Sequence, residues 1–355
     1  MSRRQLVALG ALVAVFAGGP LLQDNIFWIR VLTFALLLSA VAQSWNLLAG
    51  YAGQWSLAQL AFFGVGAYAA GILEQRFDIP LLIGLVIAVG ITALFAGAIG
   101  YVTLRIRGHY FALVTFLLTV SLYELVRFFA DYTGGQYGLS ISFEPGTDVL
   151  MLQFEDQIYY YYLAVVVMLI ATATIWLIAR SRLGLTLRAI RDDEDAAAAL
   201  GIRVLGLKVV AMAVSASMAA VSGVAYLATY KLMDAETAFG IHNSLDPVVA
   251  GILGGAGTLS GGVVGEFILQ PVIAQVNVQF GSLPGIASLI YGLILMLAIL
   301  IIPQGLLRLA RPGGIKRFNA GLKSRFTTAQ ESRATVRPTV SEPEISQEVL
   351  RDEQL

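Results

Sequence analysis

The chain has 355 residues, of which 57% are hydrophobic and 13% charged, and its mean hydropathy is +0.77. Soluble globular domains carry about one quarter charged residues, so this composition indicates a membrane protein. The 23 Lys and Arg residues balance 23 Asp and Glu residues, which excludes the basic surplus of a nucleic-acid-binding protein. With no Cys and two His, the chain lacks the residues for disulfides, thiolate chemistry or a zinc site, and we expect no cofactor.

Charge-free apolar runs locate the expected membrane spans, because a helix needs about 20 mostly apolar residues to cross the hydrocarbon core. The run from Val31 to Leu73 is twice that length and has Gly50, Gly53 and Gln54 near its middle, so it predicts two helices joined by a turn. Together the runs predict ten spans and an all-α transmembrane helical bundle. The other runs are Leu6 to Leu22, Ile79 to Leu104, Gly108 to Tyr123, Gln157 to Ala179, Val209 to Tyr230, the Gly-rich Pro247 to Gly265, and Phe267 to Leu307, which holds two spans.

The basic residues predict the orientation, because Lys and Arg accumulate in cytoplasmic connections. With Arg3 and Arg4 inside, ten crossings place both termini and the connection from Arg180 to Lys208 (180–208) in the cytoplasm. The loop from Asp131 to Asp156 (131–156) then lies outside, and it carries five acids but no Lys or Arg. We expect residues 1–308 to form the membrane domain and residues 309–355, where the apolar pattern has stopped, to form a disordered cytoplasmic tail.

The connection from Arg180 to Lys208 contains an Ala-rich run that follows acids and ends at Gly201. Acids near the start and a glycine at the end predict a short helix over Arg188 to Gly201. This helix either docks a cytoplasmic partner and transmits force to the two neighbouring spans, or is a plain surface helix. The pattern alone favours the surface helix. The sequence has no GxxxxGK[ST] phosphate-binding loop, so any ATP must bind on another chain.

The same connection carries a family resemblance. Asp195-Ala196-Ala197 followed by Gly201 resembles the EAA…G loop of permeases in ATP-binding-cassette importers, with Asp195 in place of the usual Glu and without a downstream Leu-Pro. The stretch from Leu187 to Ile202 is more specifically similar to the permeases for branched-chain amino acids, the LivM type. Three further segments agree in order and spacing, so that the resemblance covers nearly all of residues 30–308. They are Trp45 to Gln59, Gly251 to Gly261, and Tyr291 to Leu307.

The resemblance implies a permease subunit that is not itself an enzyme and lies in a bacterial-type inner membrane. Its expected partners are a second related permease, two cytoplasmic ATP-binding cassette subunits and an external or periplasmic solute-binding protein. The expected solutes are leucine, isoleucine and valine; urea or short-chain amides are the alternative, and a passive small-solute channel is another. The residues expected to contact the ATPase are Arg188, Arg191, Asp192, Glu194, Asp195, Ala196, Ala197 and Gly201.

Amides and hydroxyls in the second and third spans need partners, because polar groups in hydrocarbon are costly unless they are paired. They either join helices, which is the favoured interpretation, or line a solute path. The glycines of the Gly-rich span indicate either close helix packing, again favoured, or a broken helix beside a pathway. The candidate path residues are Asn46, Gln54, Ser56, Gln59, Gly254 and Gly257. We expect Asp246 and Glu266, which flank the Gly-rich span, to lie at the membrane interface.

Overall fold

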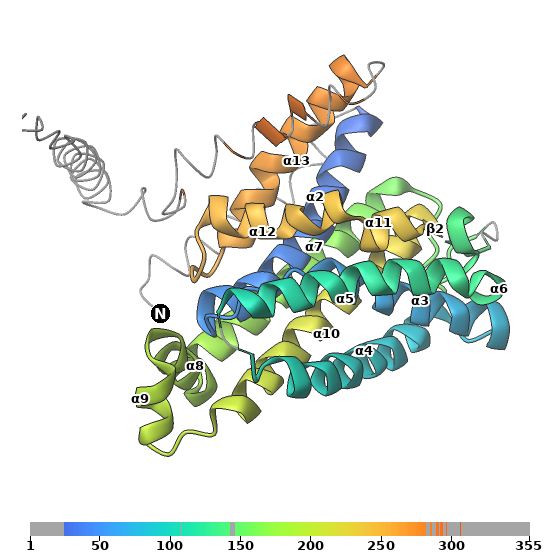
Figure 1. Cartoon of the computed structure of the whole chain (residues 1–355). Helices are drawn as coiled ribbons and strands as arrows, with labels where there is room; N and C mark the ends of the chain where they lie inside the picture. The colour runs from blue at the N-terminus through green and yellow to red at the C-terminus, as the bar shows by residue number, and fades with distance from the viewer. Residues whose placement is uncertain are drawn as a thin grey trace, which may run out of the picture. The chain divides into compact units, whose positions relative to one another are not determined.

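A computed structural model describes residues 25–281, except residues 107 and 143–145, together with residues 285, 289, 290, 292, 293, 296 and 306. The described part is almost entirely helical and carries one two-stranded ladder (Figure 1). The predicted first span, Leu6 to Leu22, and the predicted tail, 309–355, lie outside the described residues.

The run from Val31 to Leu73 forms two helices with a turn between them, as predicted. Helix α2 spans Ile26–Trp45 and continues into a π-helix, η2 (Asn46–Tyr51), and α3 spans Gln59–Phe77. Helix α2 begins before the charge-free run because Asn25 caps it, its side chain accepting a hydrogen bond from the Phe27 N–H at 3.0 Å. Arg30 therefore lies inside the first turns of the helix and not ahead of it.

Four further predicted spans are single helices of 20 to 27 residues. They are α4 (Leu81–Thr103), α5 (His109–Phe128), α7 (Gln157–Arg180) and α10 (Val204–Tyr230). The loop between α5 and α7 contains the short helix α6 (Ala130–Thr133), the 3-10 turn η3 (Gly135–Tyr137) and strand β1 (Leu139–Ser140). Strand β1 pairs antiparallel with β2 (Leu232–Met233), Leu139 lying opposite Met233, so this loop is anchored to the end of α10.

The Gly-rich region does not form the single span predicted from Pro247 to Gly265. After α11 (Ala235–Phe239), helix α12 (Ile241–Gly254) ends and a new helix, α13 (Gly261–Phe280), begins. Fourteen residues of α-helix extend about 21 Å, short of a hydrocarbon core about 30 Å thick. Gly255 and Gly257 adopt φ angles of 115° and 77°, which glycine tolerates and a continuous helix does not. Glu266 lies within α13 and is fully buried in the protein, and its expected place at the membrane interface stays a prediction.

In the described part, six helical segments are long and apolar enough to cross a membrane. They are Ile26–Tyr51, α4, α5, α7, α10 and α13. The predicted count of ten is not confirmed, since α12 is short and since the first span and most of residues 282–308 lie outside the described residues.

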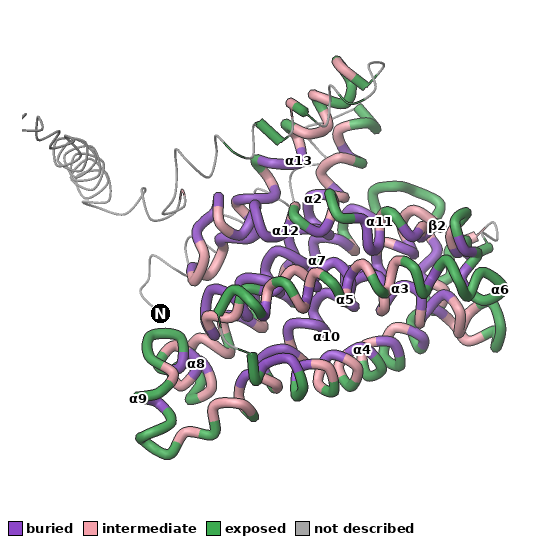
Figure 2. The backbone as a smooth tube through the Cα atoms, viewed as in Figure 1, coloured by how far each residue is buried: buried purple, intermediate pink, exposed green. Residues whose placement is uncertain are grey.

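Helix α2 occupies the centre of the bundle, where it packs against α7, α10, α12 and α13. Figure 2 shows buried residues concentrated along α2, whereas α4 and α5 carry exposed residues along one side. Many of those exposed side chains are large and apolar, for example Leu94 and Leu117. Apolar side chains on an outer surface are expected where helices face lipid or another membrane subunit.

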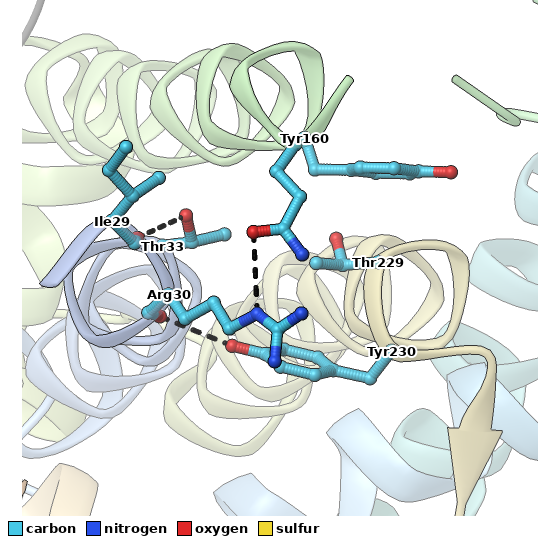
Figure 3. A pocket seen from close by; sticks show the side chains of 7 residues that line it. Ile29, Arg30, Thr33, Tyr160, Thr229 and Tyr230 are labelled. Atoms are coloured by element: carbon cyan, nitrogen blue, oxygen red, sulfur yellow. Dashed lines mark hydrogen bonds between the residues drawn. The ribbon is translucent and has the colours of Figure 1, made fainter. Parts of the chain in front are cut away.

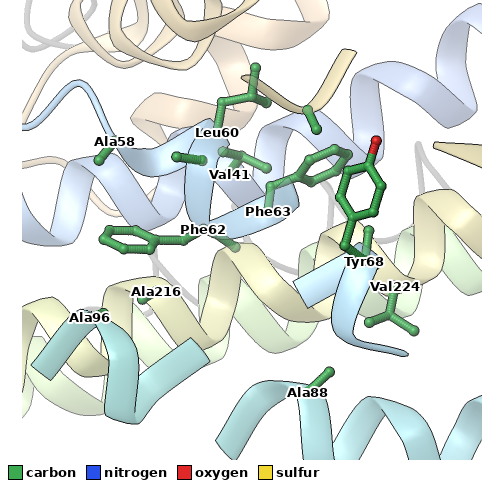
Figure 4. Packing of buried hydrophobic residues seen from close by; sticks show 14 of the residues in the cluster. Val41, Ala58, Leu60, Phe62, Phe63, Tyr68, Ala88, Ala96, Ala216 and Val224 are labelled. Carbon is green, nitrogen blue, oxygen red and sulfur yellow. The ribbon is translucent and has the colours of Figure 1, made fainter. Parts of the chain in front are cut away.

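Small residues allow α3 and α10 to approach each other closely. A Cβ built at Gly66 would lie 2.6 Å from the Ala220 Cα, and one built at Gly223 would lie 2.0 Å from the Phe63 carbonyl oxygen. Figure 4 shows Phe62 and Phe63 of α3 in the buried cluster formed with residues of α2, α4 and α10. Backbone contact through small residues is a usual way for membrane helices to pack.

We predict that Gly223→Ala lowers the melting temperature of the purified, detergent-solubilised protein, because the added methyl group collides with the α3 backbone. Overpacking of this kind costs about 1–3 kcal/mol. Gly90→Ala is the matched control, since nothing lies within 4 Å of a Cβ built at Gly90 of α4. Equal melting temperatures for the two variants would contradict the close approach of α3 and α10.

Candidate functional site

The connection between α7 and α10 forms two short helices and not the single helix expected over Arg188 to Gly201. Helix α8 spans Arg182–Asp192 and α9 spans Glu194–Ala199. Asp193 separates them with an extended backbone, and its carboxylate accepts hydrogen bonds from the N–H groups of Asp195 and Ala196, each at 3.0 Å. An Asp in this role starts a new helix and stops the preceding one. Gly201, at φ 81°, follows the end of α9.

Both helices are fastened to the neighbouring spans. Arg188 of α8 donates from Nη2 to the Ala179 carbonyl at the end of α7, at 3.1 Å. Glu194 of α9 pairs with Lys208 of α10, the carboxylate oxygen lying 2.6 Å from a Lys208 Nζ that is fully buried. A buried charge is costly unless it is paired, so this contact fixes α9 on α10.

The expected ATPase-contacting residues lie on two sides of this α8–α9 segment. Ala197 is buried together with Leu187 and Ile190, and these side chains face the rest of the protein. Arg188 and Glu194 are half-buried in the contacts just described. The residues on the exposed side are Arg191, Asp192, Asp195, Ala196 and Gly201. Two large apolar side chains also project from the segment, Leu185 at 69% and Leu200 at 83% exposed.

Asn46, a candidate path residue, binds the Gly-rich loop between α12 and α13. Its Nδ2 donates to the Thr258 carbonyl and its Oδ1 accepts from the Gly257 N–H, both at 2.7 Å. Gln43 adds a third bond, from Nε2 to the Leu259 carbonyl at 2.7 Å. These bonds satisfy backbone groups that the interrupted helix leaves unpaired.

Gln59 and Ser56 also form hydrogen bonds inside the bundle. The Gln59 Oε1 accepts from the hydroxyls of Ser44 and Ser215, each at 3.0 Å, and so joins α2, α3 and α10. Ser56 is buried and accepts from the Ala58 N–H at 3.2 Å. Gln54 is half-buried, and its hydrogen bond to the Ala52 carbonyl is long at 3.5 Å.

The two candidate path glycines lie at backbone contacts. A Cβ built at Gly254 would lie 1.8 Å from the Gly261 carbonyl oxygen, and Gly257 approaches the Gly50 carbonyl. The contacts of all six residues therefore include helix or loop packing, and a water-filled route beside them stays a prediction.

Arg30 lines a pocket that sequence reasoning missed, because Arg30 only marked the edge of a charge-free run. Figure 3 shows the pocket, a cavity of about 240 Å³ between α2, α7 and α10. The Arg30 Nε donates to the Gln157 Oε1 at 3.3 Å, and no carboxylate pairs with Arg30 among the described residues. The lining residues are Ile29, Arg30, Thr33, Gln157, Tyr160, Thr229 and Tyr230.

A second cation lies beside this pocket. Lys231, just beyond the end of α10, places its Nζ 5.4 Å from the centre of the Tyr160 ring. Burial lowers the pKa of Lys231 to about 8, although the nearby Glu74 carboxylate opposes the change. Arg30 and Lys231 thus place two basic side chains at and beside this pocket. Among the described residues, no three His, Cys, Asp or Glu side chains gather as a metal site requires.

Comparison with known proteins agrees with the resemblance found in the sequence. Residues 27–302 match the model of a family described as "Branched-chain amino acid transport system / permease component". The chain is 26% identical over 335 residues to the high-affinity branched-chain amino acid transport system permease protein LivM of Escherichia coli (strain K12). That alignment covers 87% of this chain and 76% of LivM. The chain is 27% identical over 284 residues to the autoinducer 2 import system permease protein LsrC of Yersinia pestis (strain Pestoides F), and this alignment covers 76% of the chain and 77% of LsrC. No solved structure matches the chain.

We predict that Asn46→Leu destabilises the protein more than Gln54→Leu does. The first change leaves the half-buried Gly257 N–H and the buried Thr258 carbonyl of the loop unpaired, at about 1–3 kcal/mol for each fully buried group. The second removes one long hydrogen bond from a half-buried side chain. Thermal unfolding of the two purified variants measures the difference, and a larger loss in Gln54→Leu would show that Asn46 does not hold the loop.

Proposed function

The chain belongs to the family of branched-chain amino acid transport permease components, and on that premise we propose that it is the membrane-spanning subunit of an ATP-driven importer. ATP is hydrolysed on separate cytoplasmic subunits, and this chain supplies half of the path for the solute. The observation that carries the proposal is the α8–α9 segment, which is fastened to α7 by Arg188 and to α10 by Lys208. A partner that moves this segment moves two spans with it.

The proposed complex contains this permease, a second related permease, two ATP-binding cassette subunits and an external solute-binding protein. In this arrangement both termini and the α8–α9 segment face the cytoplasm, and residues 131–156 face the binding protein. Residues 1–308 form the membrane domain, and residues 309–355 form its cytoplasmic tail. The path lies beside Asn46, Gln54, Ser56, Gln59, Gly254 and Gly257.

The docking surface for the ATPase is proposed to be the exposed side of the α8–α9 segment. Leu185 and Leu200 are large apolar side chains in an otherwise charged stretch, and such side chains are common anchors at protein interfaces. Asp195 and Ala196 lie on the exposed side of α9 as well. Ala197, in contrast, supports the segment from beneath and does not meet the partner.

The proposed solutes are leucine, isoleucine and valine. The family description and the LivM relative support this class, whereas the LsrC relative imports autoinducer 2. Urea and short-chain amides are the alternative. The Arg30 pocket favours an amino acid, because a guanidinium without a carboxylate partner in the described part of the chain offers charge-assisted hydrogen bonds to a solute carboxylate, which urea lacks.

We predict that Leu200→Ser weakens the association of this permease with its ATPase subunits about tenfold. The change removes a buried leucine from the interface, and burial of such a side chain contributes about 1.5–3 kcal/mol. Leu150→Ser is the matched control, because Leu150 is a leucine 52% exposed in the loop expected on the opposite side. Co-purification of the cognate ATPase from detergent extracts measures the effect. Equal recovery with both variants would remove Leu200 from the interface.

We predict that Arg30→Gln raises the KM for leucine uptake about tenfold or more, since a hydrogen bond to a charged group contributes about 1.5–3 kcal/mol. Uptake of leucinamide, which lacks the carboxylate, should change little. Arg127→Gln is the control, because Arg127 already pairs with Glu124 at 3.4 Å. Unchanged leucine uptake in Arg30→Gln would count against this pocket as a carboxylate site.

A further inference from the structure

Arg191 lies where three segments distant in the sequence meet. From the end of α8, its Nη1 donates to the Gly50 carbonyl of η2 at 2.8 Å. A Cβ built at Gly53 would lie 2.7 Å from the Arg191 Cγ, so α8 rests directly on the chain that follows η2. A Cβ built at Gly257 would lie 3.4 Å from the same Nη1, which brings in the loop of residues 255–260. We name this meeting point of Arg191, Gly50 and Gly257 the Arg191 junction.

Within the junction, η2 and the loop pack so closely that no side chain fits between Gly50 and Gly257. A Cβ built at Gly50 would lie 2.3 Å from the Asn46 Oδ1 and 2.4 Å from the Gly257 nitrogen. The Asn46 amide also binds both Gly257 and Thr258, at 2.7 Å each. Because contacts this close transmit displacement, a shift of the Gly50 carbonyl is passed on to the loop.

The backbone of η2 is irregular at the place that Arg191 binds. The Ala52 N–H bonds to the Leu47 carbonyl at 3.3 Å, and the Gln54 N–H bonds to the Leu48 carbonyl at 3.0 Å. These bonds bypass the Gly50 carbonyl, which accepts from the guanidinium instead. Short π-helical turns within α-helices occur often at functional sites.

The guanidinium also extends to the exposed side of the α8–α9 segment. Its Nη2 and Nε bind the Asp192 Oδ1 at 2.9 and 3.1 Å, and Asp192 is largely exposed. Arg188, one turn earlier, lies over the Tyr51 ring at 5.2 Å. Both arginines that the sequence suggested for ATPase docking thus contact η2.

We propose that Arg191 is a positioning residue that carries movement of the α8–α9 segment to η2 and to the loop of residues 255–260. This inference rests on the proposed function, because it takes the ATPase as the source of the movement. The planar guanidinium suits the role, since it holds Gly50 and Asp192 through different nitrogens at once, which a lysine ammonium cannot match in geometry.

The test uses the complete complex in proteoliposomes, with Arg191→Ala, Arg191→Lys and the control Arg105→Ala, an exposed arginine that follows α4 and lies outside the α8–α9 segment. ATPase association, ATP hydrolysis and leucine uptake are measured for each. A fourth measurement follows the loop directly. Since the chain has no Cys, Ala256→Cys introduces a single thiol, whose labelling rate is compared with and without a non-hydrolysable ATP analogue.

We expect Arg191→Ala to retain the ATPase, to lose at least tenfold in leucine transported per ATP, and to lose the nucleotide-dependent change in labelling. Arg191→Lys should restore part of the uptake per ATP and part of the labelling change, and Arg105→Ala should behave as wild type. Wild-type uptake per ATP in Arg191→Ala, an unaltered labelling change, or the same loss in Arg105→Ala would overturn the inference. If Arg191→Ala does not fold, Arg191→Lys decides alone, and wild-type coupling in it overturns the inference.

Failure of the proposed function has a different signature. In that case the wild-type permease neither retains the ATPase nor takes up leucine in response to ATP, which overturns the importer proposal and this inference together. A coupled wild type beside an equally coupled Arg191→Ala overturns the Arg191 junction alone.

Discussion

The hydrogen bonds from Asn46 to Gly257 and Thr258 make an interrupted helix possible inside the bundle. Residues 255–260 leave the helical ladder, and each backbone polar group they bury without a partner costs several kcal/mol away from water. One amide satisfies a donor and an acceptor of this loop, and Gln43 satisfies another acceptor. Without them α12 and α13 would have to join as one helix or place the loop at the surface.

This requirement determines where α2 lies. The side chains that hold the loop are on the inner part of α2 and the start of η2, so α2 must pass through the middle of the bundle beside α12 and α13. There its own backbone becomes an acceptor for neighbouring helices: Ser222 donates to the Leu37 carbonyl and Ser215 to the Ser44 carbonyl, both at 2.7 Å. Serine and glycine on α10 thus both favour close packing of α10, since small residues bring backbones close enough for such hydrogen bonds.

The sequence alone predicts the positions of those spans whose ends are marked by charged residues, because moving Lys, Arg or Asp into hydrocarbon is costly. Helices α4 and α7 follow that rule to within two residues, whereas α5 continues past Glu124 to Phe128 and α10 begins at Val204, ahead of Lys208. It failed at Pro247 to Gly265, where glycine's freedom at positive φ, and not charge, ends the helix. The prediction of one helix over Arg188 to Gly201 was also wrong, because an Asp such as Asp193 can lie inside the first turn of a helix or cap a new one, and only the backbone shows which.

The contacts of the candidate site were less accessible to sequence reasoning. The partners of Asn46 and Arg191 lie 211 and 141 residues away along the chain, and no local pattern encodes such pairings. Lys208 appeared to be the ordinary cytoplasmic edge of a span, yet it is fully buried against Glu194. Ala197 fitted the family motif as a contact residue, yet the helix phase set by the Asp193 cap turns it inward.

Under the proposed function, the break between α8 and α9 at Asp193 affects how movement of the ATPase reaches the bundle. Helix α8 is fastened to α7 by Arg188 and to η2 by Arg191, whereas α9 is fastened to α10 by the buried Lys208 pair. A single straight helix would move all three contacts together. Two helices joined at one extended residue allow the α7 side and the α10 side to respond differently to the same partner. Because α2 packs between α7 and α10, a difference between those responses acts on α2 and on the loop that Asn46 holds.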